Sequence, residues 1–456
     1  MTFTVLLLGF CTIYFLDYAV PTLWLVAGFG TVVLFVILYN QLTIRWHRLS
    51  AERYASYIFR LNLILGVIVV ALCQMAFFSF GQNYFEPGAA DSVIYHKHGS
   101  NLAEMFLQLD FRVSKYLTET GLDDFGFPVY LGVLYAIFGP SPVVVFAFNI
   151  FLHAFSAQLV FKITTRAFPL PVAKSASLLM SIFPIFLIYE GILLKEILMI
   201  FLLLASTHYG LVIFENNRLL FIKVLLFLVA TISLFFFRTV LGICFLAGFF
   251  IFTGFQLWHS GSYRFIKLAA ILVVASSILI YLVNTGILNE ILLTADRSVN
   301  QMDAELADKA SRGQGLSFNK VIIGPLIGVS SLVAPFSTLV FLDEQVLIVW
   351  NFPSTLMKNI LSFFALMGIW NTFRHELKRF ALPLFFTIFY TIVLIASAQV
   401  TSQRFQLVIW PFLCIFMANG LYTFNRKKIN VWYLYLVALT VVLFAWNFFK
   451  LYIRDL

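Results

Sequence analysis

The sequence predicts an all-α, polytopic integral membrane protein with about thirteen transmembrane helices in a single domain, 1–456. The 456 residues are 61% hydrophobic and only 11% charged, and the mean hydropathy is +0.95, whereas a soluble protein carries about a quarter charged residues. Apolar runs near the roughly 17–25 residues needed to cross a bilayer recur along the chain. Short Lys/Arg clusters separate them. Because only helices or closed barrels satisfy the backbone in lipid, and these runs are too long for strands, the spans are expected to be helices.

Several classes of function are excluded by composition. The net charge of +9 is spread over clusters between apolar runs, which is typical of cytoplasmic loops and not of a nucleic-acid surface. The four cysteines lie in apolar runs and form no CxxC pattern, so no disulfide framework is expected. No Gly-rich Walker-type loop with Lys and Ser/Thr is found, which argues against an ATP-driven pump.

The first part of the chain, 1–60, is predicted to form a helical hairpin (4–16 and 23–39) followed by a cytoplasmic loop with several arginines. The run 61–80 then crosses outward and delivers a first outer loop, 82–139. Within this loop, the apolar run 127–138 is bounded by Pro and Gly and is too short to span, so it is expected to lie along the outer surface.

The later spans follow from run length and from the Lys/Arg clusters. They are predicted at 143–161, 175–189, 197–214, 221–237, 240–257, 265–283, 357–370, 382–396, 405–422 and 431–448. A second outer loop is expected at 284–353. Its apolar part, 321–349, is broken by prolines and glycines. We expect this part to re-enter the membrane or lie on the surface, because one more span would put Arg374 and Lys378 outside.

Two kinds of polar residue are predicted to gather on the outer face. The candidate catalytic acids are Asp91, Asp123 and Asp124. The candidate ligands of the substrate or of a carrier phosphate are Tyr95, Lys195, Glu196, Arg238 and Arg404. Ionisable groups at span ends are costly unless they are paired or functional. The alternative interpretation of each is a salt-bridged end residue, or one whose long side chain reaches back to the interface.

The chemistry of these residue types indicates an anionic lipid substrate. Lys and Arg at a membrane interface suit a lipid-linked phosphate or diphosphate. A carboxylate beside them can accept the proton of an attacking hydroxyl group during glycosyl transfer.

Four motifs carry a family resemblance. They are Asp91-x-x-x-Tyr95, the run from Phe127-Pro128 to Phe138-Gly139, Pro184…Glu190…Lys195-Glu196, and Ser402-Gln403-Arg404-Phe405 with Trp410-Pro411 and Asn419-Gly420. Their order resembles that of the GT-C superfamily of membrane glycosyltransferases, including bacterial enzymes similar to dolichyl-phosphate-mannose-protein mannosyltransferases. The resemblance covers roughly 61–215 and 395–422. It implies helices lying at the outer membrane face, a polyprenyl-phosphate-linked sugar donor and an inverting transfer.

The chain departs from the family pattern in the first loop. Many members carry a paired Asp-Glu there, whereas Ser92 follows Asp91 in this chain. The two spans before residue 60 also have no counterpart in the simplest family plan. The catalytic base is therefore Asp91 or, in its place, Asp123 or Asp124.

His96 and His98 invite a metal interpretation, with Asp91 as a third ligand. Imidazoles two residues apart share a face on an extended segment and diverge on a helix. The alternative is a pair of exposed loop histidines. The sequence does not require a divalent metal, and it leaves the cofactor unknown.

Three functions remain open. The first is transfer of a sugar from a polyprenyl-phosphate donor to an extracytoplasmic glycan, lipid or protein. The second is an O-antigen or polysaccharide repeat-unit polymerase or ligase that uses polyprenyl-diphosphate oligosaccharides, for which 284–353 would supply the large outer loop. The third is a polar-lipid transporter or flippase, ranked last because the sequence shows almost no charge at mid-span. Each implies a bacterial inner membrane protein with an extracytoplasmic active face and no nucleic-acid partner.

Overall fold

The computed structural model describes residues 2–15, 20–81, 84–86, 90–110, 112, 116, 125–215, 220–259, 333–334, 336–340, 346–396 and 402–452. The first helices are α1 (Thr2–Tyr14), α2 (Thr22–Trp46), α3 (Ala51–Gly81), α4 (Asp91–Leu107) and α6 (Gly126–Phe138). The middle helices are α7 (Pro142–Thr164), α8 (Leu170–Ile182), α9 (Pro184–Glu190), α10 (Glu196–Glu215), α11 (Leu220–Phe237) and α12 (Thr239–His259). The last are α16 (Val346–Asn371), η2 (Thr372–Glu376), α17 (Leu377–Ala396), α18 (Gln403–Gln406), η4 (Leu407–Ile409), α19 (Trp410–Thr423), η5 (Arg426–Lys428) and α20 (Ile429–Tyr452).

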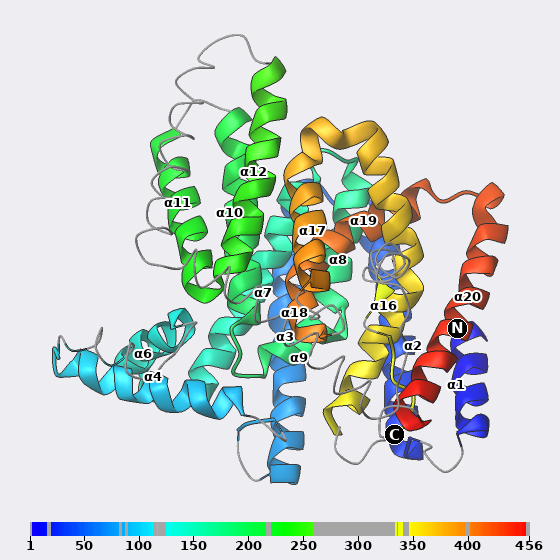
Figure 1. Cartoon of the computed structure of the whole chain (residues 1–456), viewed down its shortest axis with the longest axis horizontal. Helices are drawn as coiled ribbons and strands as arrows, with labels where there is room; N and C mark the ends of the chain where they lie inside the picture. Colours follow the sequence, from blue (N-terminus) through cyan, green and yellow to red (C-terminus); the bar gives the residue numbers. More distant parts are fainter. Residues whose placement is uncertain are drawn as a thin grey trace.

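The protein is a polytopic helical membrane protein. Among the described residues, 8 helical runs are long and apolar enough to cross a membrane, or up to 9 if the bent pair α8–α9 is one span. One run, Phe352–Ile395, has 44 residues, about 66 Å of helix and twice a bilayer core. The backbone leaves helical geometry at Phe380, and the chain reverses direction between α16 and α17 (Figure 1). This run therefore supplies two crossings, as predicted for 357–370 and 382–396.

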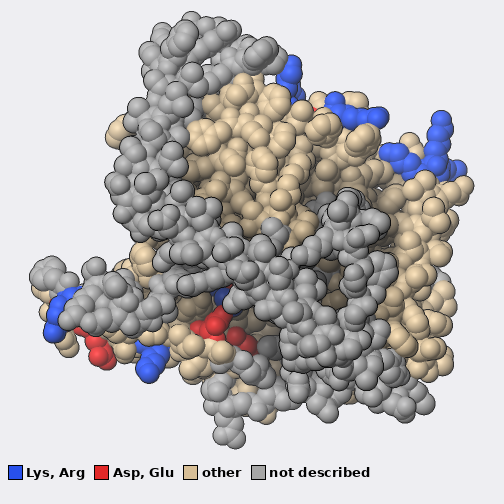
Figure 2. Space-filling view, in the orientation of Figure 1, with Lys and Arg blue, Asp and Glu red and all other residues tan. Residues whose placement is uncertain are grey.

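The total of about thirteen spans stays a prediction. The expected span 265–283 lies outside the described residues. The helices α1 and α11 are apolar but shorter than a full crossing. Figure 2 shows Lys and Arg atoms gathered along the upper edge, at the end of the molecule where α16 turns into α17 and where η5 lies.

Two helices lie crosswise to the long bundle. Figure 1 shows α4 and α6 together, roughly perpendicular to the other helices. Glycines allow them to pack closely: a Cβ atom on Gly99 would come within 2.6 Å of Leu131 Cβ, and one on Gly132 within 2.8 Å of Leu102 Cβ. With 13 residues, α6 is about 20 Å long and too short to cross. The predicted short helix at 127–138 is thus present, and its pairing with α4 holds the start of α4 at the bundle.

The predicted cytoplasmic loop within 1–60 is much shorter than expected. Helix α2 continues to Trp46 and α3 begins at Ala51, so the arginines at 53 and 60 belong to α3. With 31 residues, α3 is about 46 Å long and extends beyond a hydrocarbon core of roughly 30 Å, which leaves its charged first turns outside. The ammonium group of Lys174 closes the loop by donating to the carbonyl groups of Trp46 (3.0 Å), His47 (2.9 Å) and Leu49 (2.7 Å).

The predicted span 175–189 is a broken helix. Helix α8 starts earlier, at Leu170, and α9 begins at Pro184 with a bend of 50°. Proline lacks the N–H group and disfavours helical geometry in the preceding residue; Phe183 is extended, with ψ 119°. After α9 the chain is buried and non-helical over 191–195. Side chains satisfy its carbonyl groups; for example, Gln74 Nε2 donates to Gly191 O at 2.9 Å.

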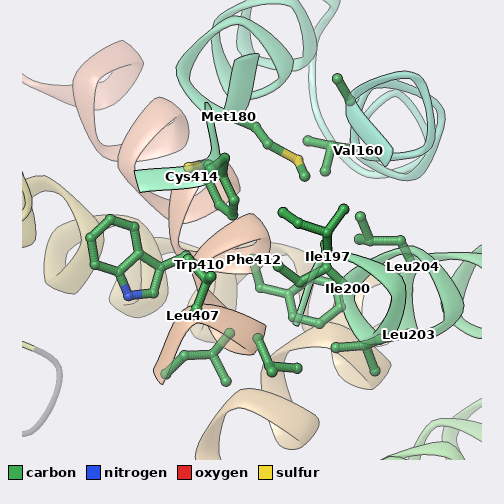
Figure 3. Close-up of a cluster of buried hydrophobic side chains, with 14 of the residues drawn as sticks. Val160, Met180, Ile197, Ile200, Leu203, Leu204, Leu407, Trp410, Phe412 and Cys414 are labelled. Carbon is green, nitrogen blue, oxygen red and sulfur yellow. The ribbon is translucent and has the colours of Figure 1, made fainter. Parts of the chain in front are cut away.

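The main hydrophobic core lies between α7, α8, α10 and α19. Figure 3 shows Val160, Met180, Ile200 and Phe412 converging from these four helices, and all four side chains are fully buried. A second buried cluster joins α1, α16 and α20; its members include Leu7, Phe15, Phe352, Leu356 and Leu443. The two cores fix α19 and α16, and thereby the short helix α18 that precedes α19.

A non-helical segment runs inside the bundle at 336–340. Asn359 Oδ1 accepts a hydrogen bond from the Ser337 N–H group (3.0 Å). Asn447 Oδ1 accepts one from the Leu339 N–H group (2.7 Å). Non-helical backbone at membrane depth is tolerated where protein groups replace water in this way. The described residues 336–340 are thus held inside the fold, and the expectation that 321–349 re-enters the membrane or lies on its surface stays a prediction.

The predicted outer loop 284–353 ends earlier than expected. Helix α16 begins at Val346, so the last eight residues of that range are helical. Residues 284–332, the first part of this range, lie outside the described residues.

Candidate functional site

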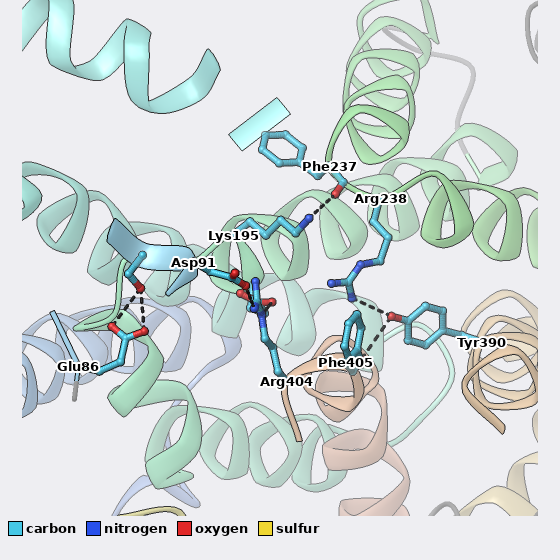
Figure 4. Close-up of polar contacts among 10 residues, drawn as sticks. Glu86, Asp91, Lys195, Phe237, Arg238, Tyr390, Arg404 and Phe405 are labelled. Atoms are coloured by element: carbon cyan, nitrogen blue, oxygen red, sulfur yellow. Dashed lines mark hydrogen bonds and ion pairs between the residues drawn. The ribbon is translucent and has the colours of Figure 1, made fainter. Parts of the chain in front are cut away.

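Five predicted site residues meet where the beginnings of α4 and α10, the junction of α11 with α12, and α18 come together (Figure 4). We call Asp91, Lys195, Glu196, Arg238 and Arg404 the Arg404 cluster. Asp91 and Arg404 are 313 residues apart in the sequence and form an ion pair. The fold therefore joins the first outer loop to the last third of the chain.

Arg404 is held by two carboxylates. Its Nε donates to Glu196 Oε1 at 2.5 Å, and its Nη1 donates to Asp91 Oδ2. The two acids differ in exposure: the Asp91 side chain is 48% exposed and that of Glu196 is 0% exposed. Glu196 Oε2 is buried and has no hydrogen-bond partner among the described residues. One acid thus faces an open region, and the other is enclosed.

The three cations lie close together because three pairs of sequence neighbours form a ring. Lys195 Nζ donates to Phe237 O at 3.1 Å, and Phe237 precedes Arg238. The Arg238 guanidinium stacks over the Phe405 ring, 4.3 Å from its centroid, and Phe405 follows Arg404. The hydrogen bond from Arg404 to Glu196, which follows Lys195 in the sequence, closes the ring.

Aromatic residues fix the cationic side of the cluster. Arg238 Nη1 donates to Tyr390 Oη at 3.2 Å, and the same hydroxyl group donates to Phe405 O at 3.3 Å. Stacking on Phe405 adds a cation–π attraction. Figure 4 shows the Lys195, Arg238 and Arg404 head groups around one region, with Asp91 on the Arg404 side. Such a group of cations, backed by low dielectric, is suited to a phosphate group.

A third carboxylate lies beside Asp91. Ser92 Oγ donates to both carboxylate oxygens of Glu86, at 2.7 and 3.0 Å. Burial raises the pKa of Glu86; the Ser92 hydroxyl and Arg404 oppose this rise, whereas Asp91 adds to it. Ser92, the residue that departs from the family pattern, therefore orients an acid that comes from six residues earlier in the chain.

Tyr95 lies one helical turn after Asp91 on α4. Burial raises the pKa of its phenol, and the positive charge of Arg404 opposes that rise. Tyr95 therefore belongs to the surroundings of Arg404, and its role as a substrate ligand stays a prediction.

The two histidines of the first loop do not face one another. Both lie on α4, where residues two apart diverge. His96 Nδ1 is 3.0 Å from Tyr135 Oη, and His98 Nδ1 is 2.7 Å from Tyr116 Oη. Burial lowers the pKa of each imidazole. The extended segment on which the metal interpretation depended is a helix, so these histidines do not form a shared ligand pair.

Two other predicted elements have a different outcome. Asp123 and Asp124 lie outside the described residues. Within the described part of the chain, no group of three or more His, Cys, Asp or Glu side chains is arranged to hold a metal ion. The carboxylates of Asp91 and Glu196 are instead directed at the Arg404 guanidinium.

The interior contains an ionisable pair that sequence reasoning undervalued. His153 Nδ1 contacts Glu190 Oε1, and both side chains are 0% exposed. His153 is a core residue, and Glu190 is its partner. Gly66 makes room for the acid, because a Cβ atom there would lie 2.4 Å from Glu190 Oε2. Glu190 is buried because α9 is short and ends inside the bundle.

Lys358 is a buried cation that the sequence analysis missed. Its Nζ donates to the carbonyl group of Ala334 and to Gln406 Oε1 (2.5 Å), and it lies 5.5 Å from the centroid of the Trp410 ring. Lys358 and Asn359 interrupt an otherwise apolar span, and that interruption was the available signal. Lys358 is therefore an exception to the near absence of charge expected within the spans.

Neither a scan against protein-family models nor a search of curated proteins finds a match to this chain. The geometry of the Arg404 cluster and the sequence motifs that contain its residues are therefore the observations that bear on function.

Proposed function

We propose that this protein is a membrane glycosyltransferase that moves a sugar from a polyprenyl-phosphate-linked donor to an extracytoplasmic glycan, lipid or protein. The supporting observation is the grouping of three cations, Lys195, Arg238 and Arg404, beside the half-exposed carboxylate of Asp91. A phosphate group needs the cations, and an attacking hydroxyl group needs the base.

The proposed reaction is a single inverting displacement. The acceptor oxygen forms a bond to the anomeric carbon of the sugar as the bond from that carbon to the phosphate oxygen breaks. The phosphate leaves with the electron pair of that bond, and the three cations stabilise the charge. Asp91 accepts the proton of the acceptor hydroxyl. In this scheme Glu196 acts through Arg404 and is a positioning residue.

The direct test uses the full chain in lipid nanodiscs with a polyprenyl-phosphate sugar radiolabelled in the sugar. Release of labelled sugar to water, or its transfer to an added acceptor, supports the proposal. A matched incubation with Asp91→Asn controls for contaminating enzymes. Retention of all label on the carrier, under conditions where the protein binds that carrier, would contradict transferase activity.

The orientation is part of the proposal. Ser100 lies on α4, and Ser50 lies between α2 and α3 near the basic end of the fold. In intact bacterial cells, we expect a cysteine in place of Ser100 to react with a membrane-impermeant maleimide, and a cysteine in place of Ser50 to react only after permeabilisation. External labelling of the Ser50→Cys variant would reverse the active face.

A polar-lipid transporter is the second candidate, because ionisable groups inside the bundle are typical of transporters. Glu190, His153 and Lys358 are such groups. A transporter moves the intact labelled lipid between leaflets without releasing sugar, so proteoliposomes containing that lipid separate the two functions. The repeat-unit polymerase depends on 284–353, most of which lies outside the described residues.

A further inference from the structure

We propose that Arg404 changes partner during the reaction: Glu196 holds it throughout, whereas Asp91 holds it only until an anionic phosphate head group arrives. This inference depends on the proposed function and deepens it. It explains how a carboxylate can be restrained in the empty site and become available as a base only when a donor is bound.

The two ion pairs of Arg404 are unequal. Glu196 is fully buried at the start of α10, and Arg404 Nε donates to it. Separating the buried Glu196 carboxylate from the Arg404 guanidinium would leave a poorly compensated charge in low dielectric, which is strongly unfavourable. Asp91 is 48% exposed and contacts the terminal Nη1 atom. Exposed pairs contribute little because water and salt screen them, so the Asp91 contact is the one that can be exchanged.

The position of the exchange is also defined. Lys195 and Arg238 lie on the side of Arg404 away from Asp91. Lys195 donates to the carbonyl group of Phe237, and Arg238 stacks on the Phe405 ring. A phosphate group bound between them would approach the Arg404 guanidinium and compete with Asp91 for its terminal donors, since an arginine fork suits phosphate as well as carboxylate. Arg404 Nε, held by Glu196, keeps the fork aimed during the exchange.

The released Asp91 can then accept the proton of the acceptor hydroxyl group, which attacks the anomeric carbon from the side opposite the phosphate. In the empty site the Asp91 carboxylate is paired with Arg404. In the occupied site the phosphate becomes the partner of Arg404, and the Asp91 carboxylate is free to contact the acceptor hydroxyl group. The donor thus activates its own base. Before donor binds, the same ion pair keeps water or a stray hydroxyl from being activated.

The experiment measures binding of polyprenyl phosphate, which lacks a sugar and cannot react, to the parent and three variants in nanodiscs. Asp91→Asn removes the competing charge and should tighten binding about two- to fivefold, the range expected from an exposed ion pair. Asp91→Glu keeps the competing charge and should bind like the parent. Asp110→Asn removes an acid from the same loop that is paired with exposed Arg112 and should also bind like the parent.

A parallel series with inorganic phosphate identifies the source of the anion. If only the lipid form binds, the acyl chain contributes; if both bind and respond to Asp91→Asn alike, the site recognises phosphate itself. Either result supports the exchange, provided that the Asp91→Asn gain is present and shrinks at high salt.

The outcomes separate the two proposals. Unchanged or weaker binding by Asp91→Asn, with normal binding by the parent, overturns the exchange and leaves the transferase proposal intact. Absence of polyprenyl phosphate binding by a folded parent protein overturns both.

Discussion

Two ionisable groupings in this protein look alike in chemistry and differ in exposure. In the Arg404 cluster, one acid is half exposed and one arginine has two carboxylate partners. The His153–Glu190 pair is also an acid with a nitrogen base, but both side chains are completely buried. Breaking a buried pair is far costlier than breaking an exposed one. The first grouping can therefore exchange partners in a reaction, and the second is suited to holding α7 against α9.

The largest expected effect is on turnover, and it comes from the half-exposed Asp91 of the Arg404 cluster. Asp91→Asn should reduce turnover by about 10²–10⁴-fold, because general-base assistance is typically worth that much. The fold should be kept, since the side chain is half exposed and the N-cap residue of α4 is Ala90, not Asp91. Turnover of labelled donor by Asp91→Asn and by the control Asp110→Asn provides the measurement. Full activity in Asp91→Asn would move the search for the base to Asp123 and Asp124.

The second effect concerns the buried His153–Glu190 pair and is measured as a change in the free energy of unfolding. His153→Leu leaves Glu190 without its partner and should lower the free energy of unfolding by about 3–5 kcal/mol. In the double variant His153→Leu/Glu190→Leu, both polar groups are replaced by apolar ones, and most of this loss should be recovered. Denaturant unfolding of the two variants and the parent forms the comparison.

If the double variant is no more stable than His153→Leu, so that none of the lost free energy of unfolding is recovered, the pair is not a structural unit. Loss of lipid movement in a stable double variant would give the pair a functional role and favour the transporter. Retained transferase turnover in the double variant would support a structural role for the His153–Glu190 pair and a functional role for the Arg404 cluster.

The third effect concerns the cations. Truncation of Lys195, Arg238 or Arg404 to Ala should each weaken donor binding by about 1.5–3 kcal/mol, the value of a hydrogen bond to a charged group, or roughly 10- to 150-fold. Lys97→Ala is a suitable control, because Lys97 is exposed on α4 outside the cluster. If all three truncations bind donor like the parent, these residues only serve to anchor the span ends.

The smallest effect is the pH dependence set by Glu86. Burial raises its pKa, so the folded chain binds this proton more tightly than the unfolded chain. Its contribution to stability is therefore greatest below the unfolded pKa near 4.3 and is lost as the pH rises through the folded pKa. Ser92→Ala removes a hydrogen bond that favours the charged carboxylate, should cost about 1 kcal/mol, and should extend the loss to higher pH.

Unfolding midpoints measured from pH 4 upward for the parent, Ser92→Ala and Glu86→Gln check this sign. Glu86→Gln should remove the pH-dependent slope. A slope that persists unchanged in Glu86→Gln belongs to another group.

Much of the fold was predictable because lipid imposes simple constraints on sequence. The spans corresponding to α7, α10, α12 and α20 were located from run length, since a bilayer requires a long, nearly uncharged helix. The short helix α6 was identified for the complementary reason. Helix ends were less accurate: α3 starts within the expected loop because helix formation continues into water where nothing in the sequence stops it.

The sequence by itself determined the membrane class, the approximate spans and the residue types of the candidate site, because hydropathy and charge act locally along the chain. The tertiary structure alone decided partners: that Arg404 bonds both Asp91 and Glu196, that Ser92 holds Glu86, and that Glu190 points inward to His153. These contacts join residues that packing brings together from different helices. Which of them are exposed, and hence exchangeable, depends on how the helices cover one another, and no local pattern in the sequence encodes that.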